Sequence, residues 1–531
     1  MDFRKLAPAA AKRRLHSGEE IAFLDVREAA PFGEGHPLFA VPCPYSRIEV
    51  STLALVPRLD AAIILIDDGD GIAERSAHRL ASCGYSDVSI VEGGMPAWAD
   101  AGFGVFSGVY VPSKTLGELL EHSHHPKVID AATLDEWQKT DQPHLFFDAR
   151  PPEEFAKMAI KGARCLPNGE LGHRFASVVH DDDIPIVITC AGRTRGIVGA
   201  LGLLASGVSN PVFALENGTQ GWALAGLPLA RGTTPDPLPE LDIADRKASR
   251  QRAQQLIERS GLPLITPLQV DALLKDEERT TYLLDLRSAP ERDARPCPEA
   301  VPVLAGQLVQ STDQYIGVRH AQLVLVDDTG LRAAFAAVFL RALGFEPYVL
   351  ALDDEPAAPL AFARKAQLQP PAEPTLLTPT EAAQRVTHPG VVILDVRPSQ
   401  DRERGRLTDS IWAVRSQLPA LLPPGISEVI LYTADAAGAA ACSLDLVESG
   451  ITTFWLNADL ATCAAASLSV DNQKQAMARE QAVDRVWFVH DRHDGNREAS
   501  LQYLAWEMGL LAQLDAEERA EFADMGLAPV A

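Results

Sequence analysis

The chain has 531 residues, more than one hydrophobic core usually organises, so its length predicts roughly three to five domains. An apolar share of 47% and a charged share of 23% are typical of globular proteins and exclude a largely disordered chain. The formal net charge of −24 makes nucleic acid and anionic lipid poor partners, because the surface should repel phosphate.

The N-terminal segment predicts an amphipathic helix instead of an apolar signal segment, and no run of about 18 apolar residues occurs. We therefore expect a cytoplasmic protein with no membrane partner. Seven cysteines are scattered along the chain without Cys-x-x-Cys spacing, which argues against a disulfide framework and a zinc cluster. We expect no cofactor and no metal.

One short pattern recurs four times, an apolar strand that ends in Asp-x-Arg. The four pairs are Asp25 with Arg27, Asp148 with Arg150, Asp285 with Arg287, and Asp395 with Arg397. Successive aspartates are 123, 137 and 110 residues apart (148 − 25, 285 − 148 and 395 − 285), about one domain each. The repeat therefore predicts four copies of one domain.

Each copy alternates continuous apolar runs with helix-length segments, which is typical of an α/β fold with a mostly parallel central sheet flanked by helices. For the second copy the sequence predicts helices at 133–139 and 196–206, and strands at 145–148, 184–189 and 211–215. Proline-rich or polar stretches predict linkers at 111–114, 232–240 and 369–374.

The predicted domains are 1–108, 122–232, 262–356 and 376–470, followed by a helical C-terminal tail over 471–531. Within the tail we expect helices at 497–513 and 516–523. Four apolar residues at helical spacing predict that the first of these helices docks on the fourth domain: Leu504, Trp506, Met508 and Leu511.

Several motifs follow one another in the second copy in a characteristic order. They are Asp148-Ala-Arg150, Glu153-Glu154-Phe155, Ile160-Lys-Gly-Ala163, Cys190 after a strand, and Asn217-Gly-Thr-Gln-Gly-Trp222. The first copy has Asp25-Val-Arg27-Glu28, Gly35-His36 and Gly93-Gly94 before Trp98. This order resembles the rhodanese family. The resemblance implies four tandem rhodanese-like domains and a sulfurtransferase that carries sulfur as a cysteine persulfide.

The motifs depart from the family pattern in three places. The second copy has Met158-Ala159 where the family usually has Gly-His, and its loop glycine follows the cysteine by two residues instead of three. The third copy lacks the closing Gly-Gly and Trp. The sequence therefore predicts the reaction class more firmly than the substrate.

Cys190 is the predicted catalytic nucleophile. It follows an apolar run and precedes a helix, so loop amides and the helix dipole should lower the pKa of its thiol below about 8.5. Gly192 should permit tight curvature, and Arg193 and Arg195 should hold an oxyanion. The predicted substrate-binding residues are Ala191, Gly192, Arg193, Thr194, Arg195 and Gly196.

Asp148 and Arg150 are expected to brace the domain as a buried ion pair, and a supporting role at the site is the alternative. The other copies carry no cysteine at the loop position. They read Asp67-Asp68, Asp327-Asp328 and Ala434-Asp435 instead, and carboxylates there should repel anionic donors. The sequence thus predicts one active and three inactive domains.

The leading hypothesis is a transfer of sulfane sulfur from thiosulfate or a related donor, through Cys190, to cyanide or a thiol. An alternative is a module that binds or delivers persulfide to a dedicated protein partner. A phosphatase is disfavoured because only four residues separate Cys190 from Arg195, one fewer than in tyrosine phosphatases. Weaker alternatives are Cys165 as a resolving thiol and metal ligation by His122-Ser-His-His125 or His490-Asp-Arg-His493-Asp494.

Overall fold

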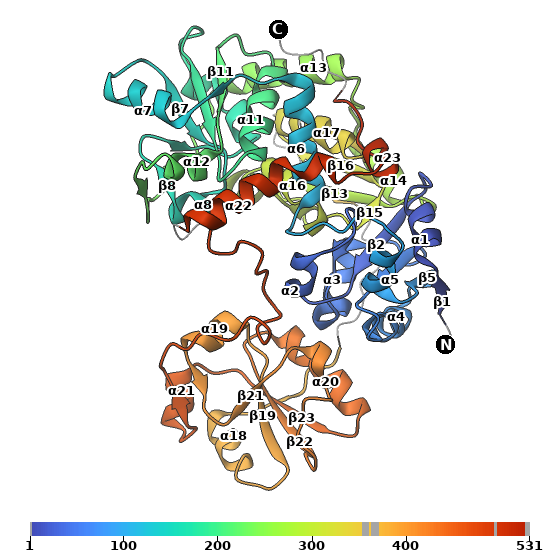
Figure 1. Cartoon of the computed structure of the whole chain (residues 1–531). Coiled ribbons are helices and arrows are strands. Elements are labelled where there is room, and N and C mark those ends of the chain that lie inside the picture. The colour runs from blue at the N-terminus through green and yellow to red at the C-terminus, as the bar shows by residue number, and fades with distance from the viewer. Residues whose placement is uncertain (1–2, 353–360, 363–370, 493–495, 526–531) are drawn as a thin grey trace. The chain divides into compact units, whose positions relative to one another are not determined.

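The computed structural model describes residues 3–352, 361–362, 371–492 and 496–525. They build four main sheets with helices on their faces (Figure 1). The sheets fall into two compact units. One unit contains the first and fourth sheets, and the other contains the second and third sheets with the C-terminal helices. Each unit is described by itself.

The second sheet carries the predicted nucleophile and has the strand order β6-β11-β10-β7-β9. All neighbours are parallel, and helices cover both faces, which is why Ile186, Val187 and Ile188 in the central strand are fully buried. One core lies between the sheet and α9, α10 and α11, and the other lies under α7 and α12. The bounds are β6 (Val128–Ile129), β7 (Leu145–Asp148), β9 (Arg164–Cys165), β10 (Ile186–Thr189), β11 (Val212–Leu215), α7 (Ala131–Lys139), α8 (Pro152–Lys157), α9 (Glu170–His173), α10 (Phe175–Val178), α11 (Thr194–Ala205) and α12 (Gly218–Leu224).

The other three sheets repeat this strand order. The first is β1-β5-β4-β2-β3, the third β14-β13-β16-β17 and the fourth β18-β23-β22-β19-β21. In the third, a parallel bridge from Leu264 to Val349 stands where the fifth strand would be. The strands of the first sheet are β1 (Arg4–Leu6), β2 (Ile21–Asp25), β3 (Val41–Pro42), β4 (Ile63–Ile66) and β5 (Val88–Val91). Those of the third are β13 (Thr281–Asp285), β14 (Val301–Pro302), β16 (Gln322–Asp327) and β17 (Glu346–Ala351). Those of the fourth are β18 (Thr375–Leu376), β19 (Val391–Asp395), β21 (Ser410–Trp412), β22 (Glu428–Tyr432) and β23 (Thr452–Leu456).

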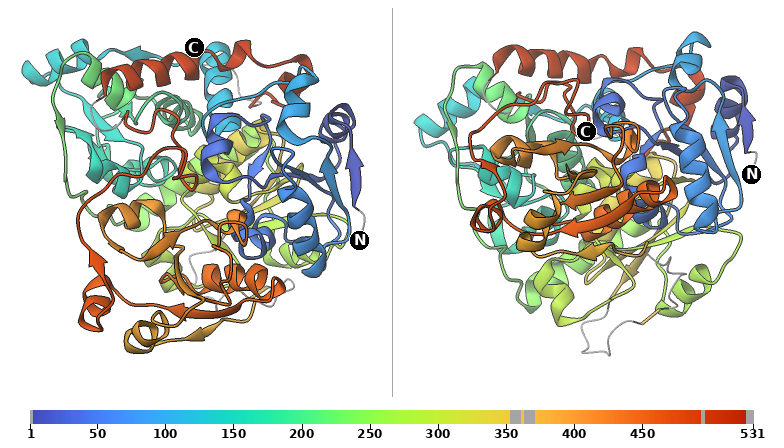
Figure 2. Two further views of the ribbon diagram at one scale, coloured as in Figure 1. Left: turned by 60° about the horizontal axis from the view of Figure 1, so that its bottom comes forward. Right: turned by 90° about the horizontal axis from the view of Figure 1, so that it is seen from below.

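Helices cover these sheets in the same way, and Figure 2 shows the fourth sheet in orange between its own helices. In the first copy they are α1 (Pro8–Leu15), α2 (Ala29–Glu34), α3 (Ile48–Leu55), α4 (Ile72–Ser82) and α5 (Gly94–Asp100). In the third they are α14 (Pro267–Leu274), α15 (Ala289–Ala294), α16 (Ala305–Gln310) and α17 (Leu331–Ala342). In the fourth they are α18 (Pro379–Arg385), α19 (Ser399–Arg404), α20 (Ala436–Glu448) and α21 (Leu460–Ala465).

The repeated Asp-x-Arg motif forms an ion pair at the end of the strand in every copy, and the pair is buried in the first three and partly buried in the fourth. Arg150 Nε and Nη2 lie 2.9 and 2.6 Å from the two carboxylate oxygens of Asp148, and the Arg150 backbone N–H also donates to that carboxylate. The pairs Asp25–Arg27, Asp285–Arg287 and Asp395–Arg397 repeat these contacts. The predicted bracing role is confirmed.

The predicted elements of the second copy are confirmed to within two residues at each end, and the predicted linker 232–240 contains no helix or strand, but the predicted linker 111–114 is wrong. The stretch after the first copy forms α6 (Val111–His124), which packs on α11, and α13 (Ile243–Ser260) precedes the third copy and packs on α17. Both helices lie outside or across the predicted domain bounds. Part of the predicted linker 369–374, and residues 353–356 of the predicted third domain, lie outside the described residues.

The predicted docking of the first tail helix on the fourth domain is wrong. The tail forms α22 (Arg497–Met508) and α23 (Ala516–Ala520), and α22 lies against α6 and α12 of the second copy. Tyr503 and Leu504 are buried there, whereas Met508 is 50% exposed. The buried side of the helix is therefore not the apolar face that we inferred from the spacing. None of the described helices is both long enough and apolar enough to cross a lipid bilayer.

We expect replacement of one partner of a buried pair to be costly. Arg287→Leu leaves the Asp285 carboxylate buried without its opposite charge, which should reduce the free energy of unfolding by about 3–5 kcal/mol, measured by urea denaturation. The double variant Asp285→Leu/Arg287→Leu should lose less. The exposed pair Lys139–Asp135 is the control, and Lys139→Met should leave the midpoint unchanged. An equal loss in the single and double variants would contradict the prediction.

Candidate active site around Cys190

Cys190 lies between the central strand and a helix of the second copy. β10 ends at Thr189, the loop runs over Cys190–Arg193, and α11 begins at Thr194. Parallel strands end at one edge of a sheet, so the loop meets the N-terminus of α11 at that edge. The side chain is only 2% exposed. The thiol thus has the predicted position in the fold but lies below the surface.

One backbone amide of the loop and one in the first turn of α11 contact the sulfur. The N–H groups of Gly192 and Gly196 hydrogen-bond Cys190 Sγ, and both contacts lower the pKa of the thiol, as does the charge of Arg195. Burial outweighs them, however, and the carboxylate of Glu507 acts in the same direction as burial. The net effect is a pKa above its ordinary value. The predicted lowering of the Cys190 pKa is therefore wrong for this structure, in which the thiol is buried.

The first turn of α12 holds the cysteine loop through backbone hydrogen bonds. Thr219 N donates to Cys190 O at 2.8 Å, and Gln220 N donates to Ala191 O at 3.1 Å. This close approach requires glycine at position 218, which has φ +53°, because a Cβ there would lie 2.3 Å from Cys190 O. The predicted closing motif therefore holds the loop that carries the cysteine.

Glycine is needed at position 192 because a neighbouring helix lies close to it, and not because the backbone curves there. Its φ is not in the left-handed region. A Cβ built on it would lie 3.1 Å from Tyr503 Cε1 and 3.2 Å from Glu507 Oε2, both on α22. The glycine therefore lets the C-terminal helix approach the loop. No local sequence pattern indicates this contact, because about 310 residues separate the two segments.

Arg193 pairs with carboxylates of α6. Its Nε donates to Glu118 Oε1 at 2.7 Å, its Nη2 forms a short hydrogen bond with Glu121, and its Nη1 lies 3.4 Å from Asn217 Oδ1. Burial alone would lower the pKa of this guanidinium, but the carboxylates raise it above its usual value. The guanidinium of Arg193 is thus positively charged, and the carboxylates of Glu118 and Glu121 offset most of that charge.

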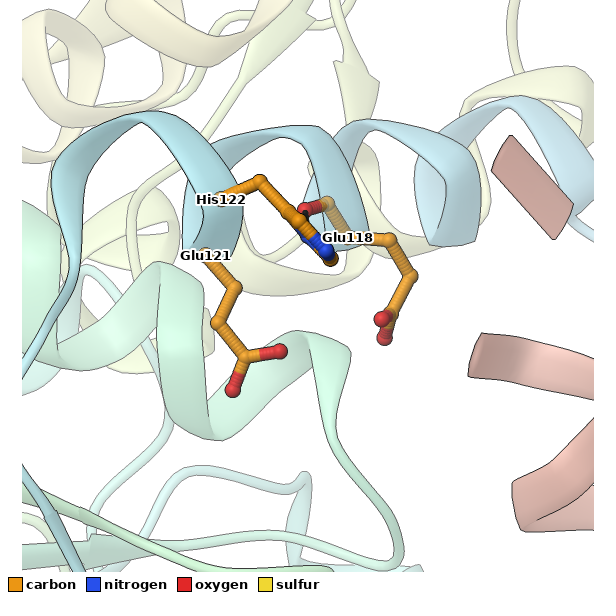
Figure 3. A group of neighbouring side chains, drawn as sticks. All are labelled: Glu118, Glu121 and His122. Atoms are coloured by element: carbon orange, nitrogen blue, oxygen red, sulfur yellow. Dashed lines mark hydrogen bonds between the residues drawn. The ribbon is translucent and has the colours of Figure 1, made fainter. Parts of the chain in front are cut away.

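Glu118 and Glu121 also form, with His122, one group among the described residues whose ligand atoms lie within 4.8 Å of one another (Figure 3). The guanidinium of Arg193 already occupies both carboxylates, and His122 Nδ1 is bonded to the Glu118 carbonyl oxygen at 2.8 Å. The group therefore fits an arginine and not a metal ion. In the second histidine motif, His493 and Asp494 lie outside the described residues.

Arg195 connects the loop with the third copy. It binds Glu154 through two hydrogen bonds of 2.7 Å, and its Nη1 lies 3.2 Å from Gln307 Oε1 on α16. Asn168 Nδ2 donates to the Arg195 carbonyl oxygen at 2.8 Å. Burial alone would lower the pKa of Arg195, but Glu154 raises it. Whether either loop arginine binds a donor stays a prediction.

In the first and third copies a carboxylate occupies the corresponding amides. Asp67 accepts from the backbone N–H groups of Gly69 and Ala73, each at 2.9 Å. Asp327 likewise accepts from the backbone of Asp328 at 2.8 Å and of Arg332 at 2.9 Å. These loops therefore hold their own anion at a helix N-terminus, in addition to repelling anions from solution.

The remaining cysteines have weaker settings. Cys165 lies on the edge strand β9, in register with Asp148, which is in register with Thr189. Two strand spacings separate Cys165 from Thr189 by about 9–10 Å, beyond the usual Cα separation in a disulfide. Burial raises its pKa to about 12. Cys43 and Cys297 lie in loops and are buried, and all seven thiols are free.

An α/β domain with a cysteine after its central strand and helix amides at the sulfur has the parts of a cysteine-nucleophile site. The family model described as Rhodanese-like domain matches residues 7–101 and 130–225. A solved structure of thiosulfate sulfurtransferase from Pseudomonas aeruginosa is 34% identical, with a TM-score of 0.89, and the match covers 98% of this chain and 100% of that one. The chain belongs to the rhodanese family.

Two smaller solved proteins are also similar in part. The rhodanese-like domain of the Alr3790 protein from Anabaena is 26% identical over 20% of this chain and 80% of that one, with a TM-score of 0.19. A rhodanese-related protein from Thermoplasma volcanium is 26% identical over 20% of this chain and 97% of that one, with a TM-score of 0.17. Both TM-scores are too low to support an inference about this chain. No curated protein matches the chain.

We expect Gly218→Ala to distort the cysteine loop. The new Cβ would collide with Cys190 O and the backbone would keep a left-handed φ, so the free energy of unfolding should fall by about 2–4 kcal/mol. Gly226→Ala is the matched control, since Gly226 has φ +80° but none of the described atoms lies within 4 Å of its Cβ position. It should cost about 1 kcal/mol. Equal losses would show that the contact with Cys190 O is unimportant.

The raised pKa of Cys190 predicts a pH dependence. The folded protein holds the thiol proton more tightly than the unfolded chain, so its contribution to stability is present below pH 9.0 and is lost as the pH rises through the higher folded value. The rate of Cys190 alkylation by iodoacetamide, followed by peptide mass spectrometry, should have its midpoint above pH 9.0. The denatured chain is the control. A midpoint below its value would contradict the prediction.

Proposed function

We propose that the chain is a sulfurtransferase that moves sulfane sulfur from thiosulfate or a related donor, through a Cys190 persulfide, to cyanide or a thiol acceptor. The observation that carries this proposal is the contact of the Gly192 and Gly196 amides with Cys190 Sγ at the N-terminus of α11. Amides that face a sulfur stabilise negative charge there, first on the thiolate and then on the persulfide.

The proposed reaction has two displacements. The Cys190 thiolate attacks the outer sulfur of thiosulfate, a new S–S bond forms, the old S–S bond breaks, and sulfite leaves with its electron pair. Cyanide or a thiolate then attacks the terminal sulfur, the Cys190–sulfur bond breaks, and the thiolate is regenerated as thiocyanate or a new persulfide leaves. Covalent transfer of this kind gives ping-pong kinetics.

We propose that the donor binds the loop of Ala191–Gly196 mainly through its amides. Arg193 and Arg195 would add less free charge than the sequence suggests, since each is paired with glutamate. Asp148 and Arg150 would act as positioning residues, because β7 ends beside β10 and holds the strand that leads to Cys190.

The third and fourth sheets share the strand order of the two segments that match the family, and this supports four rhodanese-like domains at 1–108, 122–232, 262–356 and 376–470, with a tail at 471–531. We propose that only the second is catalytic. The carboxylates of Asp67 and Asp327 at their own loop amides support the inactivity of the first and third.

A second candidate is the delivery or binding of persulfide for one protein partner, with little turnover of small molecules. The 2% exposure of Cys190 favours it, because a buried sulfur is protected from small acceptors. Rapid thiocyanate formation by the full chain would exclude this candidate. Slow turnover, combined with fast loss of the persulfide to a single captured protein, would favour it over the first.

We expect Cys190→Ser to abolish sulfur transfer. Wild-type protein exposed to thiosulfate should gain the mass of one sulfur atom and release sulfite, and cyanide should remove that sulfur as thiocyanate. Cys190→Ser should do neither, while Cys165→Ser, the control thiol on the edge strand, should behave as wild type. Equal activity of wild type and Cys190→Ser would overturn the proposal.

A further inference from the structure

The C-terminal helix α22 lies directly on the cysteine loop. Thr194 Oγ1, at the first residue of α11, donates to Glu507 Oε1 at 2.6 Å. Tyr503, one turn before Glu507, lies against Gly192, whose built Cβ would be 3.1 Å from Tyr503 Cε1. Figure 1 shows α22 in red crossing α6, and the contacts between these two helices agree with that view. The tail therefore supplies part of the surroundings of Cys190.

The contact is buried and charged. Tyr503 is 6% and Glu507 0% exposed. Lys114 of α6 donates to Tyr503 Oη at 2.5 Å and lies 3.7 Å from Glu507 Oε1. The other oxygen, Glu507 Oε2, has no hydrogen-bond partner among the described residues and lies 3.2 Å from the Cβ position of Gly192. A buried carboxylate oxygen thus faces the loop, and none of the described groups donates to it.

The sulfur is inaccessible while α22 is in place, since Cys190 is 2% exposed. The loop is tied to its own domain by backbone hydrogen bonds from Thr219 and Gln220 and by the bond from Asn168 to Arg195. Side-chain bonds hold α22 on the loop and α6, from Thr194 to Glu507 and from Lys114 to Tyr503. Arg497 Nη1 on α22 also donates to Leu224 O at 2.7 Å. Side-chain contacts therefore hold the helix, whereas backbone hydrogen bonds hold most of the loop.

We propose that α22 is the cover of the Cys190 site and that Tyr503 and Glu507 decide which reagents reach the sulfur. Tyr503 blocks the approach over Gly192. Glu507 repels anions there, because its free oxygen faces the loop and Lys114 offsets only part of its charge. The proposal deepens the proposed function and rests on it for its biological meaning: the covered site discriminates against the more highly charged donor. Access to the thiol can be tested without sulfur transfer.

The test uses the full chain and two alkylating reagents of similar size, neutral iodoacetamide and anionic iodoacetate. Modification of Cys190 is followed by peptide mass spectrometry. Both reagents attack the same thiolate, so the ratio of their rate constants does not depend on the pKa of Cys190. The variants are Tyr503→Ala, Glu507→Gln, which keeps a side chain able to accept from Thr194, and Met508→Ala, the control on the exposed side of α22.

Tyr503→Ala should raise both rate constants about tenfold and leave their ratio unchanged. Glu507→Gln should raise the iodoacetate-to-iodoacetamide ratio about fivefold or more and lower the KM for thiosulfate more than it changes kcat. Met508→Ala should match wild type in both rates. Unfolding midpoints confirm that each variant is folded.

Wild-type rates in both Tyr503→Ala and Glu507→Gln would overturn the proposal. So would a ratio that rises equally in Glu507→Gln and Met508→Ala, since that change would not come from the charge of Glu507. If the alkylation results hold but thiosulfate never modifies Cys190, then the cover is correct and the proposed sulfur transfer is wrong.

Discussion

The ion pair between the aspartate and the arginine of the repeated Asp-x-Arg motif is the interaction on which each sheet depends. It lies at the end of the strand that carries the motif. The arginine grips both oxygens of an aspartate two residues earlier, so the chain is fixed at the point where it leaves the sheet. In the second copy Asp148 is in register with Thr189, and Cys190 follows at once. The same frame occurs four times, and the copies differ in what their loops carry.

The copies that lack a cysteine at the loop position take part in buried charged contacts with their neighbours. In one unit, Arg332 of the third copy binds Asp327 at its own loop and reaches Glu170 of the second. In the other, Asp445 of the fourth copy accepts from Arg79 and Tyr45 of the first. Buried charges of this kind are costly unless each is paired, so they fix how two copies meet within a unit.

The strands, the ion pairs and the position of Cys190 could be predicted because each has a local signature. Strands covered on both faces are continuous apolar runs, and a cysteine between such a run and a helix needs no distant residue to be recognised. The partners of the site could not be predicted. Glu118 and Glu121 look like surface residues of a polar stretch until Arg193, more than 70 residues away, pairs with them.

The pKa of Cys190 shows the same limit. Loop amides and a helix N-terminus can be expected from the sequence, and they do act in the expected direction. Burial outweighs them, and Glu507 acts in the same direction from α22, a helix that lies more than 300 residues further along the chain. The spacing of apolar residues predicted an apolar docking face on α22, but this helix buries Tyr503 and Glu507.

The carboxylates of Asp67 and Asp327 at their own loop amides imply a difference in thermodynamic linkage between the copies. Those loops carry a covalently attached anion that cannot dissociate, so an external anion can add little to their stability. The amides around Cys190 instead face a thiol that is neutral while it is buried. A charged sulfur species formed there would complete the electrostatics of the loop and act as a stabilising ligand. Unlike the first and third copies, the second domain should therefore change its stability with its sulfur load.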